Sequence, residues 1–167
     1  MVFPVTESGG LRYRRLERSQ TVPVSLGRVF SFFEAPENLA LITPPRLGFR
    51  VVSPTPVVME EGKVIDYRIR LCGLPLRWRS LIASYEPPFG FVDEQLQGPY
   101  AHWRHTHRFE SCLRGTLVTD EVVYALPAGL PSVLDAMLHS LYVRPSLERI
   151  FDYRARFYAD FFDDRCG

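Results

Sequence analysis

Four side chains that alternate along residues 103–109 suggest chemistry more strongly than any other part of the sequence: Trp103, His105, His107 and Phe109. Successive side chains of a β-strand point to opposite faces, so a strand through these residues places all four on one face. A face that is half aromatic and half imidazole is typical neither of an ordinary core nor of a solvated surface. The pattern predicts one wall of a pocket, apolar enough to exclude water and polar enough to orient a small molecule.

A carboxylate beside these imidazoles would suit them to acid–base chemistry, because it sets the histidine tautomer. The following strand supplies Asp120. A four-residue loop in the hairpin over residues 111–115 places Asp120 opposite His105, whereas a three-residue loop places Glu121 there. We favour Asp120, because the residues two positions before and after it are apolar and make its face an inward one. His105, His107 and Asp120 are therefore the candidate catalytic residues.

The histidine pair is open to two other interpretations. With a carboxylate from a neighbouring strand it could coordinate a metal ion. No third histidine completes such a site, since His102 falls on the opposite strand face and His139 lies in a predicted terminal helix. The interpretation that we favour is a hydrogen-bonded pocket wall without a chemical role, so we expect no metal and no other cofactor.

The strand before Gly98-Pro99 carries two further polar candidates, Asp93 and Gln95. A three-residue loop over 97–99 places Asp93 opposite Trp103, where it is a buried carboxylate beside two histidines. A two-residue loop places it opposite Arg104 instead, in a surface ion pair that contributes little. The spacing of the residues leaves both registers open.

Periodicity along the chain predicts the elements that position these residues. The expected elements are a strand over 11–22, a helix over 26–34, a second short helix from Pro36, alternating strands from about residue 47 to 126, and a long amphipathic helix over 131–162 that Pro145 kinks or splits near Arg144. Together they predict an α+β helix-grip fold: a curved antiparallel sheet of about six to seven strands wrapped on a long C-terminal helix, with two short helices after the first strand. We expect residues 1–10 to form a loosely packed N-terminal tail and residues 11–165 a single domain.

Composition excludes several classes of protein. The chain has 167 residues and a net charge of +1, which argues against a nucleic-acid binder. No apolar run approaches the roughly 18 residues of a membrane-spanning helix, and no signal-peptide pattern opens the sequence. Three widely separated cysteines, Cys72, Cys112 and Cys166, favour free thiols in a reducing cytoplasm. A glycine-rich phosphate loop and a nucleophile elbow are both absent from the sequence.

The order of elements, together with a set of short motifs, resembles the START-like superfamily, also called the Bet v 1 or SRPBCC superfamily. The motifs are Pro23 with Phe30 and Phe33, Asn38-Leu39 with Thr43-Pro44, Leu74-Pro75 with Trp78, Phe91-x-Asp93-x-Gln95-x-x-Gly98-Pro99-Tyr100, Trp103-x-His105-x-His107-x-Phe109, and Asp120 with Tyr124, Pro127 and Gly129. The resemblance extends from about residue 10 to 162 and is most specific in the two motifs between residues 91 and 109, which resemble those of a bacterial group. It favours the inward orientation of Asp93.

The resemblance implies a deep pocket for a hydrophobic or amphipathic small molecule, and no particular reaction, because the superfamily includes polyketide cyclases, carriers, hormone receptors and lipid-transfer domains. The first hypothesis is a cytoplasmic carrier or sensor of a lipid- or polyketide-like ligand. The second is a cofactor-independent cyclase or dehydrase that uses a His–Asp acid–base pair. The third is an accessory domain whose pocket is vestigial and which recognises an unidentified protein partner. The predicted ligand-binding residues are Phe30, Phe33, Tyr67, Trp78, Asp93, Gln95, Trp103, Phe109, Tyr124 and Leu138.

Overall fold

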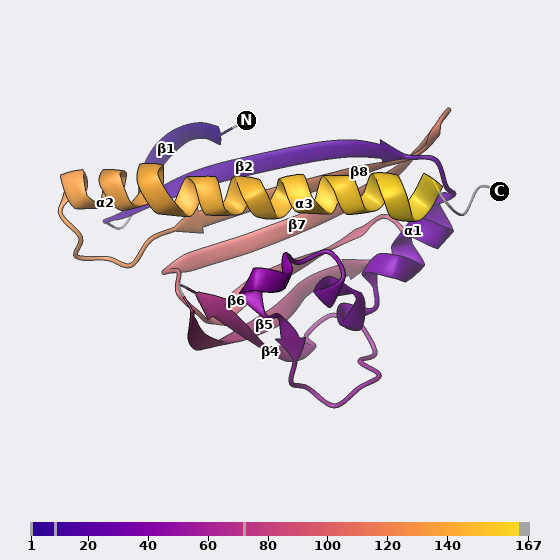
Figure 1. The fold of residues 1–167 in the computed structure, drawn as a ribbon, viewed down its shortest axis with the longest axis horizontal. Coiled ribbons are helices and arrows are strands. Elements are labelled where there is room, and N and C mark those ends of the chain that lie inside the picture. Colours follow the sequence, from indigo (N-terminus) through magenta and orange to yellow (C-terminus); the bar gives the residue numbers. More distant parts are fainter. Residues whose placement is uncertain (1, 9, 72, 164–167) are drawn as a thin grey trace.

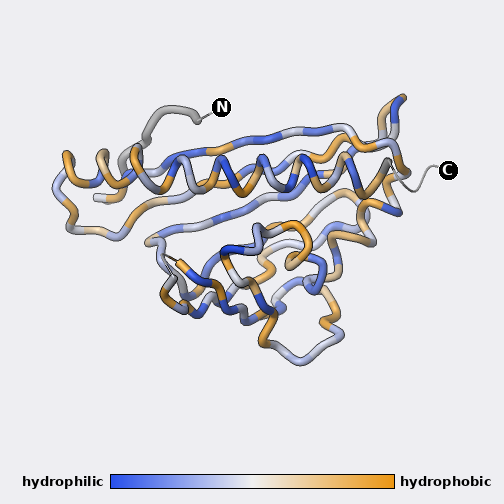
Figure 2. The backbone as a smooth tube through the Cα atoms, viewed as in Figure 1, coloured by the Kyte–Doolittle hydropathy of each residue, from blue (hydrophilic) through white to orange (hydrophobic). Residues whose placement is uncertain are grey.

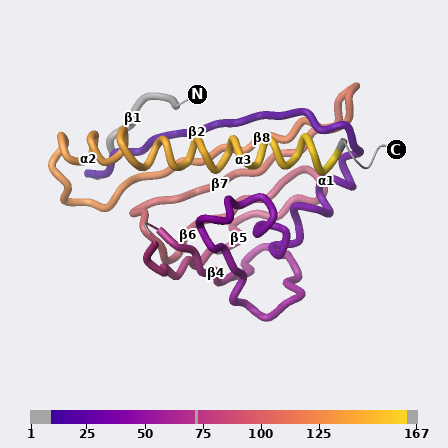
Figure 3. Tube along the Cα trace, in the orientation of Figure 1, coloured from indigo at the N-terminus to yellow at the C-terminus, as the bar shows by residue number. Residues whose placement is uncertain are grey.

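The computed structural model describes residues 2–8, 10–71 and 73–163 of the chain. One antiparallel sheet of eight strands, in the order β1-β2-β8-β7-β6-β5-β4-β3, forms the body of the fold. The strands are β1 (Val2–Ser8), β2 (Leu11–Val22), β3 (Arg50–Val51), β4 (Val64–Leu71), β5 (Leu74–Glu86), β6 (Gly90–Gln97), β7 (His102–Cys112) and β8 (Gly115–Ala125). Strand β2 pairs with β8, which is far from it in the sequence, and Figure 3 shows the two side by side.

Helical segments occur at two places in the part of the chain that the structure describes. Helix α1 (Leu26–Phe33) and the 3₁₀ helices η1 (Pro36–Ala40) and η2 (Pro45–Leu47) follow strand β2. After the sheet come α2 (Ser132–Leu138), the π-helical segment η3 (His139–Val143) and α3 (Arg144–Asp163). Figure 1 shows α2, η3 and α3 running on as one long helix along β2, β7 and β8. The predicted helix-grip fold is therefore confirmed. The described residues add η2 to the two short helices expected after residue 22, and their sheet has eight strands where about six to seven were expected.

Pro145 interrupts the long helix without splitting it. The backbone N–H of Arg144 donates to the carbonyl of His139, five residues back, which makes the preceding turn a π-helical one. A wide turn of this kind accommodates the missing N–H of a proline one residue later. The expected disturbance near Arg144 is thus a π-turn, and the helix continues beyond it.

Two expectations need correction or qualification. Residues 2–8, predicted to be part of a loosely packed tail, form strand β1, which pairs with β2 from Val2 opposite Leu16 to Ser8 opposite Leu11. Cys112 is a free thiol, as predicted, and it is exposed, whereas Cys72 and Cys166 lie outside the described residues. None of the helices in the described part of the chain has the length and hydropathy needed to span a membrane.

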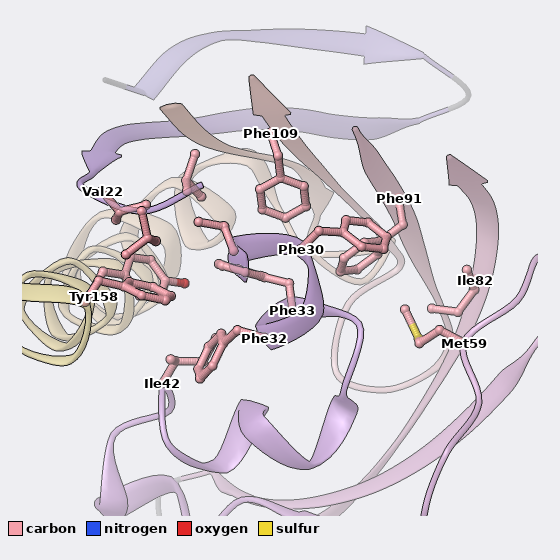
Figure 4. Close-up of a cluster of buried hydrophobic side chains, with 14 of the residues drawn as sticks. Val22, Phe30, Phe32, Phe33, Ile42, Met59, Ile82, Phe91, Phe109 and Tyr158 are labelled. Carbon is pink, nitrogen blue, oxygen red and sulfur yellow. The ribbon is translucent and has the colours of Figure 1, made fainter. Parts of the chain in front are cut away.

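The main hydrophobic core lies where α1 meets the sheet and the end of α3. Figure 4 shows Phe33 of α1 and Phe109 of β7 pointing into this cluster, and their ring centroids are 4.8 Å apart. Tyr158 of α3 packs on the other side of Phe33, at 5.5 Å. Along α3, hydrophobic and hydrophilic residues alternate in short stretches (Figure 2), as expected for a helix with one face against a sheet. This core closes one end of the space between sheet and helix.

Candidate functional site

A cavity of about 850 Å³ lies between the sheet and the long helix. Its walls come from α1, η1, strands β4 to β7, the loop after β8, and the helix from α2 to α3. Its aromatic lining residues are Phe32, Phe33, Phe49, Tyr67, Trp78, Phe91, Tyr100, Trp103, Tyr142 and Phe151. A volume of this order is typical of sites for drug-sized small molecules, which are mostly apolar with a few polar groups.

Two histidines and two aspartates form the polar part of the wall. Asp93 on β6 lies directly opposite His105 on β7, and His107 lies directly opposite Asp120 on β8. His105 Nε2 is 3.0 Å from Asp120 Oδ1, and His107 Nε2 is 3.3 Å from Asp93 Oδ2. Two further approaches close the ring: His105 Nδ1 lies 3.6 Å from Asp93 Oδ2, and His107 Nδ1 lies 2.8 Å from Asp120 Oδ1. We call these four residues the His–Asp cluster.

None of the registers considered for the two hairpins is the observed one, and the favoured ones, Asp120 opposite His105 and Asp93 opposite Trp103, are each wrong by two residues. The β7–β8 hairpin turns through the two residues between Cys112 and Gly115, so Val122, and not Asp120, is opposite His105. The Asp120 side chain contacts His105 diagonally, because Asp120 is opposite His107, two residues further along β7. Asp93 is opposite His105, and not Trp103 or Arg104. A shift of two residues keeps every side chain on its face, so Asp93 does face the cavity.

Local sequence explains how β6 and β7 are held beside each other. Gly90 is required where β6 passes His107, because a Cβ atom there would lie 2.3 Å from the His107 carbonyl oxygen. At the other end, Gln95 ties the turn: its Nε2 donates to the Tyr100 carbonyl at 2.7 Å. Gly98 leaves room for this side chain, because a Cβ atom at position 98 would displace the Gln95 amide from its place beside Tyr100. Gln95 thus holds the turn and does not line the cavity, contrary to the prediction.

Burial works against the ionised forms of both aspartates, but hydrogen bonds and nearby charge outweigh it. Contacts from His105 and His107 hold the pKa of Asp120 below its ordinary value. A hydrogen bond from His107, with the charges of the histidines and Arg154, also lowers the pKa of Asp93. The lowered pKa values favour the ionised form of both carboxylates, of which Asp120 is buried and Asp93 half-buried, so the surroundings must compensate negative charge.

The two histidines respond to this environment in opposite directions. Burial favours a neutral ring in both, but contacts with Asp120 and Asp93 outweigh it at His107 and raise its pKa. At His105, burial and the charge on His107 lower the pKa despite the hydrogen bond with Asp120. The surroundings therefore favour the protonated form of His107 and the neutral form of His105. Two neighbouring groups whose pKa values are pushed apart are a typical arrangement for proton transfer.

Aromatic rings fix the positions of both imidazoles. Phe91 stacks on His107, with ring centroids 4.2 Å apart, and the two imidazole centroids are 3.8 Å apart. Trp103 and Phe151 present their rings edge-on to His105, at 6.3 and 5.8 Å. The cluster thus sits in a packed wall that restricts ring rotation.

The structure separates the predicted ligand-binding residues into two groups. Phe33, Tyr67, Trp78, Asp93, Trp103 and Leu138 line the cavity, together with His105 and His107. Phe30 and Phe109 instead belong to the core cluster, because α1 covers that end of the sheet. Tyr124 lies in a second core cluster, and its hydroxyl pairs with His139 Nε2 at 2.9 Å. Asp120 lies behind the histidines and is almost fully buried.

Arg154 of α3 is a cavity residue that the sequence analysis missed. Its guanidinium lies over the Phe151 ring, 5.1 Å from the centroid. Among the described residues, neither Nε nor Nη1 of Arg154 has a hydrogen-bond partner, although both atoms are buried. The signal was present in the sequence: Arg154 follows Ile150 by four residues and Phe151 by three, so it lies on the apolar face of the helix.

Comparison with solved structures found the same fold in several proteins. The chain superposes on the di-domain ARO/CYC StfQ of the steffimycin biosynthetic pathway with a TM-score of 0.70, at 16% identity, over 93% of this chain and 52% of StfQ. It matches the ZhuI aromatase/cyclase from Streptomyces sp. R1128 with a TM-score of 0.67, at 14% identity over 93% of this chain and 96% of ZhuI. A START superfamily protein from Mycobacterium smegmatis matches with a TM-score of 0.64, at 10% identity over 90% of this chain and 97% of that one.

These likenesses show the fold. The chain has the START-like, or SRPBCC, fold, as the sequence motifs indicated, and it spans about half the length of the di-domain StfQ. Comparison of the sequence with protein-family models found no match, and comparison with curated proteins found none either.

Proposed function

We propose that this protein binds a hydrophobic or amphipathic small molecule, lipid- or polyketide-like, in the cavity between the sheet and the long helix, as a carrier or sensor. The observation that carries the proposal is the cavity of about 850 Å³, which is lined mainly by apolar and aromatic side chains. The His–Asp cluster and Arg154 supply a polar wall that would orient a ligand with one polar end. A cavity of this size argues against a vestigial pocket, which the accessory-domain hypothesis assumed.

Intrinsic fluorescence offers a direct test, because the chain has two tryptophans, Trp78 and Trp103, and both line the cavity. Their ring centroids are 5.2 Å apart. We expect 8-anilinonaphthalene-1-sulfonate, an aromatic amphipathic probe, to bind saturably and to quench tryptophan emission by energy transfer. Native mass spectrometry of gently purified protein would then identify any apolar molecule that co-purifies.

A matched pair of variants on the long helix makes the test specific. Ile150→Arg introduces a charged side chain into the cavity wall and should weaken probe binding strongly. Leu141→Arg is the control, because Leu141 is 74% exposed and does not line the cavity. Equal probe affinity in both variants, with thermal unfolding unchanged, would contradict the proposal.

The second candidate function is acid–base catalysis at the His–Asp cluster, of the cyclase or dehydrase type. It is favoured by the position of His105 and His107, which contact carboxylates on one side and the cavity on the other. Aromatase/cyclases among the similar structures are consistent with this chemistry. His105→Gln should then abolish turnover of a polyketide-like substrate while leaving probe binding within about twofold of wild type; loss of binding and turnover in parallel would contradict it.

A further inference from the structure

We propose that Asp93, His105 and His107 form a binding site for a divalent first-row transition-metal ion on the wall of the cavity, with Asp120 as its outer-shell support. One ligand atom from each of the three residues lies within 4.8 Å of the other two. The atoms that face one another are Asp93 Oδ2, His105 Nδ1 and His107 Nε2. The proposal replaces the expectation, drawn from the sequence, that no metal is bound.

The spacing of the donor atoms fits a metal ion. Asp93 Oδ2 lies 3.3 Å from His107 Nε2 and 3.6 Å from His105 Nδ1. Two metal–ligand bonds of about 2.0–2.1 Å that meet at a tetrahedral angle hold their donors about 3.3–3.4 Å apart. An ion can therefore enter between the carboxylate and the two imidazoles with only small side-chain movements.

The outer nitrogens of both rings share one carboxylate oxygen. Asp120 Oδ1 lies 3.0 Å from His105 Nε2 and 2.8 Å from His107 Nδ1. The first contact is a hydrogen bond, whereas the second is too far out of line to be a good one. Metal-bound histidines typically donate their second N–H to such a carboxylate, which orients the ring and increases its basicity. Asp120 already does this for His105, and a small rotation of the His107 ring would bring its Nδ1, 2.8 Å away, into line with the same oxygen.

Charge and access favour a metal ion in the same place. Asp120 is buried and Asp93 is half-buried, and carboxylates that are removed from water in proteins are paired or coordinate metals. Asp120 is almost fully buried and does not line the cavity, whereas Asp93, His105 and His107 all border it. Three protein ligands on one side leave coordination positions open for water or for an oxygen donor of a bound molecule. Arg154 borders the same space, so the loaded site would favour an anionic oxygen, such as a carboxylate or enolate.

Metal binding is tested with Co²⁺ and Zn²⁺ alone, on protein freed of metal by a chelator and carrying no polyhistidine tag. We expect one ion per chain by equilibrium dialysis and a visible d–d absorption band for Co²⁺. Paramagnetic Co²⁺ should shift the ring protons of two of the four histidines of the wild-type protein. No binding at micromolar free metal, or largest shifts at His102 or His139 in place of His105 and His107, would overturn the proposal without any variant.

Variants assign the ligands. His107→Gln and Asp93→Asn should lose more than the ~10–100-fold in affinity that we expect for the outer-shell variant Asp120→Asn. His102→Gln is the matched control, because His102 is on the same strand, does not line the cavity and packs on Tyr13 at 5.1 Å. Asp93→Asn is the variant least at risk of misfolding, and circular dichroism checks each one. Unchanged affinity in folded Asp93→Asn and His107→Gln would refute the assignment.

The outcome of the metal-binding test is independent of the proposal that the cavity binds a hydrophobic small molecule. Binding of the fluorescent probe is measured on the metal-free protein and depends on the apolar walls around Trp78 and Trp103. If metal fails to bind while the probe does, the His–Asp cluster is a hydrogen-bonded wall and the carrier proposal stands. If the metal binds and the probe does not, the metal site stands and the proposed function fails.

Discussion

Asp120 and Asp93 contact the same two histidines, yet the structure predicts that replacing them has different effects on stability. The Asp120 side chain is 5% exposed and lies behind the rings, whereas that of Asp93 is 19% exposed and faces the cavity. Asp120→Asn preserves the shape of the side chain but removes the buried charge opposite His107. Breaking a buried ion pair on one side typically costs about 3–5 kcal/mol, because the remaining group stays buried and uncompensated.

Asp93→Asn should destabilise the protein less, by about 1–2 kcal/mol, because water in the cavity can replace part of the lost interaction. The expected difference between the two variants is therefore about 2 kcal/mol or more. Urea unfolding at pH 7, with chelator present so that metal does not contribute, measures it directly. The comparison uses midpoints at equal slope, because a changed slope would mean that the variants differ in the surface exposed on unfolding.

Equal loss of stability in the two variants, or a larger loss in Asp93→Asn, would refute the reasoning. It would mean that water has no better access to the cavity side of the cluster than to the buried side.

The wild-type protein should also lose stability as the pH falls below the ordinary carboxylate range, because both folded-state pKa values are depressed and the unfolded chain then binds more protons.

Three further predictions concern other parts of the fold. Burial and the charge of Arg14 lower the pKa of His139 to about 4, so NMR should show its ring protons titrating near that pH. The free energy of unfolding should fall as the pH drops from about 6.5 towards 4, because only the unfolded chain takes up the proton in that window. A titration of His139 near pH 6.5 would contradict this prediction. Arg14 forms a buried ion pair with Asp135, so Asp135→Asn should destabilise by about 3–5 kcal/mol in urea unfolding; a loss below about 1 kcal/mol would show that the pair is solvated. Phe109→Ala should cost about 3–5 kcal/mol of stability but leave the affinity for the fluorescent probe within about twofold, since Phe109 is fully buried in the core and does not line the cavity. A loss of probe binding without a loss of stability would show that Phe109 does belong to the binding site.

The sequence predicted the order of elements well because each element has its own period. Alternation over residues 64–71 and 103–109 marks strands, and spacing of three and four along residues 144–162 marks the long helix. It missed strand β1, since pairing with β2 is a long-range choice that the composition of residues 2–8 does not record. It also assigned Phe30 to the cavity, because one apolar face of a helix looks the same whether it borders a core or a cavity.

The residues of the His–Asp cluster were identified from the sequence, but their partners were not. Period-two alternation determines which face each side chain takes, so it placed His105, His107 and Asp120 together on one side of the sheet. Register depends on turn length, and a change of two residues in a turn moves every partner while leaving every face unchanged. Only the tertiary structure therefore decided that Asp120 is opposite His107 and Asp93 is opposite His105. The ring of contacts among these four residues, and the burial that controls their charges, follow from that pairing.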